Sequence, residues 1–354
     1  MKNKISWQWF ATCIGLFLSV CSSAQDKTVT YLVDPASNPP ELIVALKHLK
    51  AEVRFVPAEN KVIARTDFTF VPIQYQADSM VFYAPDFKVN SAFVDKKKVD
   101  FKMSGSNLII DLRSVKPEKS KEYHLILDYD ACPQSGMIYF VGWKPWEEGK
   151  TKEIWAHRPH GWLPYMDSRI TMDMYYTFDS SFSIFANGER VGIKDNHNGT
   201  RTWNYRMTKD HPFFSTAVVI GPYDFKTSCS AGGVPLEFWY YRGQENKVKT
   251  TYAYTEAMMD FYEKEIGVCY PYQVYRQAPV IDYMYGAMET TTSTIFGDYM
   301  LIDRGAFWQR NYINTNAHEM AHQWFGNAIT QLVNKDVWLT ESFATYYAKI
   351  FERS

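Results

Sequence analysis

The stretch His318-Glu-Met-Ala-His-Gln-Trp-Phe-Gly-Asn327 decides how the second half of the chain is interpreted. Its two histidines stand at positions i and i+4 of a helical pattern, so one turn of helix places both imidazoles on the same face. Two neutral imidazoles are a common zinc pair, and a third protein ligand would leave the fourth position to water. Glu319 lies beside that face, where a carboxylate can take a proton from such a water.

A candidate third ligand is Glu341, in Trp338-Leu-Thr-Glu-Ser-Phe-Ala344. A turn at Gly326 between two antiparallel helices would bring Glu341 back to the histidines. Taken alone, the histidine pair is also compatible with a chance pattern on an amphipathic helix, and Glu341 with a surface residue in a first helical turn. Together they favour a metal site, so the sequence predicts one zinc ion per chain, bound by His318, His322 and Glu341.

The region before this site consists of short strands and turns. Residues 66–70 and 123–129 alternate in hydrophobicity, and other short apolar runs end at Gly, Pro, Asp or Ser. Only residues 41–50 have a short helical spacing. Residues 25–241 are therefore predicted to form an antiparallel β-sandwich-like domain.

Residues 242–354 have a different pattern and predict a second, α+β domain. Apolar residues at helical spacing over residues 254–265 end before Gly267, which is placed to terminate a helix. A short strand is predicted at residues 278–283, a second helix at residues 307–325, and a third from the N-cap candidate Thr340 to the end of the chain. Because the last helix is still running where the sequence stops, a C-terminally truncated domain is expected.

The first 24 residues are typical of a secretory signal peptide, with a charged start, an apolar stretch over residues 9–20, and Ser22 and Ala24 before the predicted cleavage point. Lipidation of Cys21 is the less favoured alternative because Val20 is bulky for the preceding position. Export to the periplasm or the exterior is expected. No later run reaches about 20 apolar residues, so no membrane span is expected in the mature chain.

Composition places the chain among ordinary globular proteins. The 354 residues suffice for two domains, 22% of them are charged, and the formal net charge is −1. The short run of three lysines at residues 96–98 is typical of a solvated loop, and nothing else suggests a nucleic-acid-binding surface.

The zinc pattern also carries a family resemblance. The run over residues 318–327, followed by Thr330, Asp336 and Trp338-Leu-Thr-Glu341, resembles the aminopeptidase N family of gluzincin zinc metallopeptidases. Upstream, Tyr285-Gly-Ala-Met-Glu-Thr290 resembles the exopeptidase motif of that family. The resemblance implies an N-terminal saddle-like β domain, a thermolysin-like catalytic domain and further helical parts.

The resemblance implies a role for each matching residue. His318, His322 and Glu341 would bind zinc, and Glu319 would activate the zinc-bound water that attacks the peptide bond. Glu289 would bind the free α-amino group of a peptide, so that only the first residue is removed. The main chain at Gly286 and Ala287 would pair with the extended substrate. The resemblance thus implies a zinc-dependent aminopeptidase whose partners are peptides with a free N-terminus.

Three departures from the family pattern keep alternatives open. Thr290 stands where the family has Asn, and His157 is the nearest match to a Gln or Glu of the amine pocket. The tyrosine that stabilises the transition state in this family would follow Ser354, so weak or absent activity is expected. A non-catalytic zinc- or peptide-binding fragment is the main alternative. A gluzincin with endopeptidase or epoxide hydrolase activity is another, although the motif around Glu289 argues against an endopeptidase.

Overall fold

The computed structural model describes residues 42–133 and 138–354. The predicted signal peptide and Cys21 lie outside the described residues. The chain forms two compact units: a larger one of Leu42–Thr330 with Thr340–Ser354, and a smaller one to which residues Gln331–Leu339 belong. Among the described residues, no helix combines the length and the apolar character that crossing a membrane requires.

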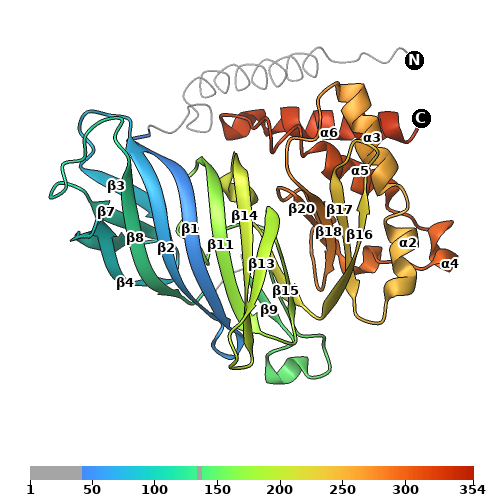
Figure 1. Cartoon of the computed structure of the whole chain (residues 1–354), viewed down its shortest axis with the longest axis horizontal. Coiled ribbons are helices and arrows are strands. Elements are labelled where there is room, and N and C mark those ends of the chain that lie inside the picture. Colours follow the sequence, from blue (N-terminus) through green and yellow to red (C-terminus); the bar gives the residue numbers. More distant parts are fainter. Residues whose placement is uncertain (1–41, 134–137) are drawn as a thin grey trace, which may run out of the picture. The chain divides into compact units, whose positions relative to one another are not determined.

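A large mixed sheet forms the first half of the larger unit (Figure 1). Buried and exposed side chains alternate along its strands, as expected for a sheet with one face against the core. Its pairs are antiparallel except that β1 and β11 run parallel. The helical spacing at residues 41–50 does not correspond to a helix in the described part of this segment, because residues 44–50 belong to β1. In sheet order the strands are β13 (Glu189–Asp195), β14 (Thr200–Pro212), β11 (Arg169–Asp179), β1 (Val44–Val56), β2 (Lys61–Pro72), β8 (Tyr123–Ala131), β4 (Phe87–Val94) and β5 (Lys97–Lys98).

Two smaller sheets cover the apolar face of the large one. Phe82 of the first packs on Phe68 of β2 with ring centroids 5.1 Å apart, and Tyr205 of β14 donates a hydrogen bond to the carbonyl of Ile184 in the second. This layered packing confirms the predicted β-sandwich character. The first sheet consists of β3 (Ser79–Tyr83), β7 (Asn107–Asp111) and β6 (Phe101–Ser104), and the second of β12 (Ser183–Ala186), β15 (Val218–Gly221), β10 (Glu153–Ala156) and β9 (Tyr139–Val141).

The second half of the larger unit is built on a five-stranded sheet. Its strands, in sheet order, are β16 (Tyr223–Cys229), β17 (Pro235–Tyr241), β18 (Tyr275–Val280), β20 (Ser293–Gly297) and β19 (Ala287–Met288). β17, β18 and β20 are parallel, while the two outer strands are antiparallel to their neighbours. The predicted boundary at residue 241 separates β16 and β17 from β18, although the three strands share this sheet. By sheet membership, the second half therefore begins at Tyr223.

Helices pack beside this sheet (Figure 1). Gly267, at φ 74°, ends α3 (Thr255–Ile266), as the sequence predicts. The helix predicted at residues 307–325 is wrong in extent, because α4 (Arg304–Phe307) and α5 (Ile313–Ala321) are separate. The last helix, α6 (Val337–Phe351), starts three residues before the predicted N-cap Thr340. The remaining helical elements are α2 (Val248–Thr251) and the 3₁₀ turns η3 (Pro57–Glu59), η4 (Pro145–Glu147), η5 (Phe213–Ser215), η6 (Glu245–Lys247), η7 (Asp298–Met300) and η8 (Asn334–Asp336).

Aromatic side chains connect α3 to its neighbours. Phe261 packs on Phe351 of α6 at a centroid distance of 5.4 Å, and the hydroxyl of Tyr262 donates to the carbonyl of Ala317 in α5. This packing holds α5 and α6 side by side, which is the relationship a shared metal site requires.

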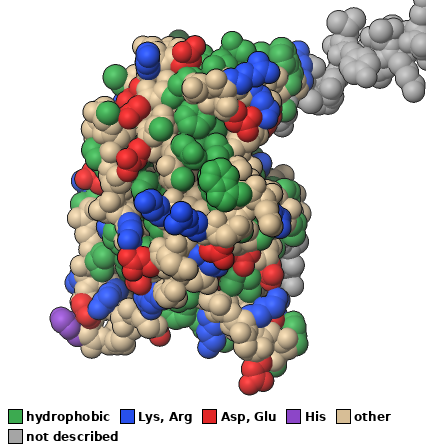
Figure 2. Space-filling model, turned by 90° about the vertical axis from the view of Figure 1, so that its right-hand side faces the viewer, with side chains coloured by type: hydrophobic (Ala, Val, Ile, Leu, Met, Phe, Trp, Pro, Cys, Tyr) green, Lys and Arg blue, Asp and Glu red, His purple; other side chains and the backbone are tan. Residues whose placement is uncertain are grey.

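On the face shown in Figure 2, positive and negative side chains are interspersed with apolar ones instead of gathering by sign.

Candidate metal centre

Three side chains from α5 and α6 converge on one point. His318 lies in the last turn of α5, His322 caps that helix, and Glu341 projects from α6. The two Nε2 atoms are 3.0 Å apart, and Oε2 of Glu341 is 3.4 Å from Nε2 of His318 and 3.5 Å from Nε2 of His322. Zinc–ligand bonds of about 2.0–2.1 Å in a tetrahedron place ligand atoms about 3.3 Å apart. These residues therefore fit a zinc ion in both chemistry and spacing.

Contacts behind the cluster orient the imidazole of His322. Its Nδ1 donates a hydrogen bond to the carbonyl of Phe325 at 2.9 Å, which leaves the lone pair of Nε2 directed at the cluster. Gly326 has φ 138°, and a Cβ there would approach Nδ1 of His322 to 3.3 Å. Glycine at this position thus gives the chain its turn and leaves room for the ring. The Nδ1 atom of His318 lies 3.4 Å from the hydroxyl of Thr345.

Charges around the cluster favour a cation. Hydrogen bonds from His318 and His322 hold the pKa of Glu341 well below its usual range. Burial alone would lower the pKa of His322, but the negative charge of Glu289 and the hydrogen bond to Glu341 outweigh it and raise this pKa to about 9. Without metal, the site therefore attracts a proton. A zinc ion would supply the positive charge in its place.

Glu319 is buried beside the ligands, with 6% of its surface exposed. Its Oε2 atom is buried and has no hydrogen-bond partner among the described residues. Burial, reinforced by the charge of Glu289, raises the pKa of Glu319 to about 8. Without metal, a carboxyl group with such a pKa keeps its proton at neutral pH. A cation held by the cluster would lower this pKa and leave a carboxylate that can accept a proton.

Glu289 and the segment before it lie at the edge of the five-stranded sheet. Ala287 and Met288 form β19, which pairs with β20 on one side and has no described strand on the other. The carbonyl of Gly286 accepts a hydrogen bond from the amide of Gly297 at 3.2 Å. Glu289 is partly buried and close enough to raise the pKa values of Glu319 and His322. The structure thus brings Glu289 near the cluster, whereas the pairing of Gly286 and Ala287 with a peptide stays a prediction.

Thr290 and His157, the two described residues that depart from the family pattern, have different surroundings. Thr290 is buried and its hydroxyl donates to the carbonyl of Ser293, so it closes a turn next to Glu289. His157 packs edge-on against Tyr283 and Tyr285 at centroid distances of 5.8 and 5.5 Å. Burial lowers the pKa of His157 to about 4, so its ring is neutral at pH 7. Its participation in an amine pocket remains a prediction.

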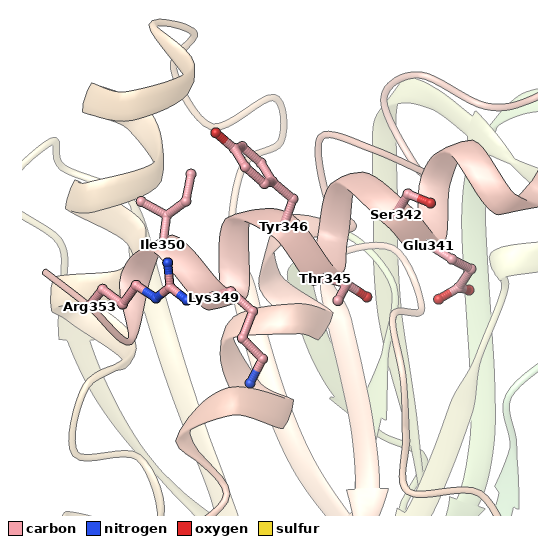
Figure 3. A pocket seen from close by; sticks show the side chains of 7 residues that line it. All are labelled: Glu341, Ser342, Thr345, Tyr346, Lys349, Ile350 and Arg353. Atoms are coloured by element: carbon pink, nitrogen blue, oxygen red, sulfur yellow. The ribbon is translucent and has the colours of Figure 1, made fainter.

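Glu341 is the solvent-facing member of the cluster. Its side chain is 53% exposed, compared with 2% for His322. It stands at one end of an open hollow of about 710 Å³ along one face of α6. In Figure 3, Thr345 lies between the Glu341 carboxylate and the cationic groups of Lys349 and Arg353. A ligand from solvent can therefore reach the carboxylate of Glu341 at the edge of the cluster.

Sequence reasoning missed three residues around this site. Gln323 directly follows His322 and Asn327 lies five residues after it, and in the sequence both stand out only as part of the run that resembles a family motif. Both donate hydrogen bonds to the carbonyl of Glu289. Tyr283 has a buried hydroxyl without a partner among the described residues. Burial raises the pKa of this hydroxyl, and the charges of Glu319 and Glu289 raise it further. No local sequence signal marks these contacts, because their partners are distant in the chain.

Comparisons with known proteins identify relatives of this arrangement. Residues 250–353 match the Peptidase family M1 domain. The chain is 24% identical over 273 residues to aminopeptidase N of Lactococcus lactis subsp. lactis, covering 73% of this chain and 32% of that protein. It is 24% identical over 240 residues to glutamyl aminopeptidase of Bos taurus, covering 64% of this chain and 25% of that protein. The chain thus spans a quarter to a third of the length of these two relatives.

Solved structures share the fold. An M1 zinc metallopeptidase from Deinococcus radiodurans aligns with a TM-score of 0.71 at 20% identity, over 89% of this chain and 72% of that one. A two-domain M1 zinc metallopeptidase bound to L-tryptophan aligns with a TM-score of 0.73 over the same shares of the two chains. These alignments confirm the predicted fold class of a β domain followed by a catalytic-type α+β domain. The M1 domain match over residues 250–353, the aminopeptidase N relatives and these alignments together indicate that the chain is similar to the aminopeptidase N-like gluzincin peptidases.

Proposed function

We propose that this chain forms the zinc-binding core of an aminopeptidase, with one zinc ion held by His318, His322 and Glu341. The observation that carries the proposal is the convergence of three ligand atoms within 4.8 Å of one another, beside a buried carboxylate oxygen that has no partner among the described residues. When bound, zinc would polarise the peptide carbonyl and acidify a water molecule. The match of residues 250–353 to the M1 peptidase domain and the aminopeptidase names of the relatives support the same activity.

The side chains of the protein supply the remaining functions. Glu319 would accept the proton of the attacking water and pass it to the leaving amine. The carboxylate of Glu289 would bind the ammonium group at the substrate's N-terminus, and the fixed distance from this carboxylate to the metal ligands would select the first peptide bond. The free edge of β19 would hold the peptide main chain as an added strand.

Export is part of the proposal. Residues 1–24 have the pattern of a signal peptide, so the mature chain would act on peptides in the periplasm or outside the cell. Fractionation of cells that produce the chain checks this point, because a cytoplasmic protein with residue 1 still present would contradict it.

The test of the function compares an aminoacyl amide with its N-acetyl derivative. Acetylation removes the charge that Glu289 would bind and leaves this carboxylate unpaired, so kcat/KM should fall by about two to four orders of magnitude. Glu289→Ala should lower kcat/KM for the free substrate alone, so that most of the difference between the two substrates disappears. Equal kcat/KM for both substrates in an active protein would exclude an aminopeptidase.

A further inference from the structure

Two side-chain amides from the metal-binding segment converge on one atom. Nε2 of Gln323 and Nδ2 of Asn327 donate hydrogen bonds of 3.1 and 2.6 Å to the main-chain carbonyl of Glu289. Both amides are fully buried. Gln323 follows the ligand His322 directly, and the amide N–H of Asn327 donates to the carbonyl of His322 at 3.0 Å. The segment that bears a metal ligand therefore also holds the residue proposed to bind the substrate's amine.

Each amide is oriented from its other end. Oε1 of Gln323 accepts from the main-chain amide of Thr292 at 2.9 Å, and Oδ1 of Asn327 accepts from the hydroxyl of Ser215 at 3.1 Å. With their oxygens engaged by donors, the two amide groups must direct their nitrogens at Glu289. Ser215 in turn accepts from the main-chain amide of Thr291 at 2.8 Å. The orientation of both amides is thus fixed by the turn that follows Glu289.

That turn contains a strained residue. Thr292 has φ 64°, a left-handed conformation that a β-branched side chain rarely adopts. Three hydrogen bonds keep it there: its N–H to Gln323, its hydroxyl from the amide of Gly188 at 2.8 Å, and its carbonyl from the amide of Arg276 at 2.8 Å. A strained backbone conformation that several hydrogen bonds maintain is typical of functional sites, where it fixes a geometry that the local chain would not adopt alone.

The β domain completes the frame. Nδ2 of Asn187 donates to the carbonyls of Thr291 and Ser215 at 2.6 and 3.0 Å, and its Oδ1 accepts from the amide of Ala217 at 2.6 Å. Every one of these groups is buried, so none can exchange its partner for water without opening the core. The position of Glu289 is therefore determined jointly by the metal-binding segment and by the β domain.

We propose that Gln323 and Asn327 are positioning residues that set the distance between the Glu289 carboxylate and the metal ligands, and with it the selection of the N-terminal peptide bond. This inference rests on the proposed aminopeptidase function. A carboxylate displaced by about 1 Å would bind the ammonium group with the scissile carbonyl out of place, which costs about two orders of magnitude in rate. Both amides are fully buried and neither belongs to the cluster of His318, His322 and Glu341, so both would act through Glu289.

Isosteric variants test the proposal. In Asn327→Asp and Gln323→Glu, an oxygen replaces the nitrogen that faces the carbonyl of Glu289, so two acceptors repel each other there. Asn316→Asp is the matched control, because Asn316 is a buried amide of α5, the helix that precedes this segment, and donates to the carbonyl of Thr251 at 3.2 Å, away from Glu289. Asn327→Ser removes the donor without adding charge and serves if the charged variants do not fold.

The measurement is the affinity, by titration calorimetry, for alanyl-alanine amide and for its N-acetyl derivative. Zinc-loaded protein with Glu319→Gln is used, so that no turnover occurs. We expect a clear preference for the free amine in this parent protein. Asn327→Asp and Gln323→Glu should each reduce the preference at least tenfold while zinc content stays unchanged, and Asn316→Asp should leave it as it is.

A double variant separates positioning from general stability. If Asn327 acts through Glu289, adding Asn327→Asp to Glu289→Ala should reduce the free-amine affinity no further than Glu289→Ala alone. The inference is overturned if the positioning variants keep the parental preference, or if the two effects multiply in the double variant. If the parent shows no preference and Glu289→Ala changes nothing, the proposed function fails and this inference fails with it.

Discussion

The Nε2 atoms of His318 and His322 face each other 3.0 Å apart. Nδ1 of His322 is bound to the carbonyl of Phe325, so the Nε2 of this ring presents a lone pair whenever the ring is neutral. The close approach then requires either a proton shared between the rings or a cation between them. The carboxylate of Glu341, within 3.5 Å of both nitrogens, adds the negative charge that makes a cation favourable.

Zinc content follows from this arrangement. Purified protein is expected to contain one equivalent of zinc by elemental analysis, and His322→Ala should lose most of it, because a tetrahedral site with two protein ligands binds far more weakly. His197→Ala is the control, since that histidine is highly exposed and lies in the turn between β13 and β14. Equal zinc content in the wild type and in His322→Ala would exclude this site.

The pH dependence of zinc binding has a defined sign. In the metal-free protein the pKa of His322 is raised to about 9, so this ring carries a proton at pH 7 that must leave when the metal binds. The apparent zinc affinity should therefore rise as pH increases from 6 toward 9, by about tenfold per pH unit for one released proton. Competition with a chromophoric chelator measures this slope. An affinity independent of pH over this range would show that His322 is not a ligand.

Glu319→Gln should retain zinc and lose peptidase activity. The amide has the shape of the carboxylate but cannot accept a proton, and loss of a general base typically costs about two to four orders of magnitude in kcat. Zinc analysis and the hydrolysis rate of an aminoacyl amide are measured on the same preparation. A variant that hydrolyses this substrate at the wild-type rate would contradict the role given to Glu319.

Local patterns explain what the sequence could predict. The i, i+4 spacing of His318 and His322 determines their common face, and Gly267 marks the end of α3 through its left-handed conformation. Glu341 was placed by its distance along the chain and by the family resemblance. The convergence of these residues follows from two helices and one turn, which short-range patterns describe well.

The frame around Glu289 could not be predicted in this way. The contact between Asn327 and Ser215 joins residues 112 positions apart, and that between Asn187 and Thr291 joins residues 104 positions apart. Such pairs form only after the β domain and the five-stranded sheet have packed together. The strand β1 could not be predicted for a related reason: its pairing with β2 and β11 overrides a weak helical spacing in the sequence of this segment.

A buried ion pair between two neighbouring strands of the five-stranded sheet, β17 and β18, should be important for stability. Arg276 is 2% exposed, and its Nε donates to Oε2 of Glu237 at 2.7 Å. Arg276→Met leaves Glu237 buried without this partner, which should lower the free energy of unfolding by about 3–5 kcal/mol. Lys150→Ala breaks the exposed pair with Asp282 and should cost at most about 1 kcal/mol. Urea unfolding of the two variants measures the contrast, and equal losses would contradict it.

The last prediction concerns Glu153, whose buried carboxyl group connects β10 to the end of β18. Its Oε2 accepts a hydrogen bond from the hydroxyl of Tyr241 at 2.8 Å, and its Oε1 accepts one from the amide of Ile281 at 3.2 Å. Burial raises the pKa of Glu153 to about 8. In the unfolded chain the group titrates near 4.5, so between these two values the folded protein binds more protons than the unfolded one.

Stability should therefore fall as pH rises from about 4.5 to about 8, and Glu153→Gln should remove this part of the pH dependence. The glutamine resembles the protonated carboxyl group, so the variant should match the wild type near pH 5. Near pH 8.5 the variant should be more stable by at least about 1.4 kcal/mol, the equivalent of one pKa unit. Urea unfolding at the two pH values measures this difference, with the exposed Glu148→Gln as the control. A constant difference between Glu153→Gln and the wild type at both pH values would mean that Glu153 does not take up a proton on folding.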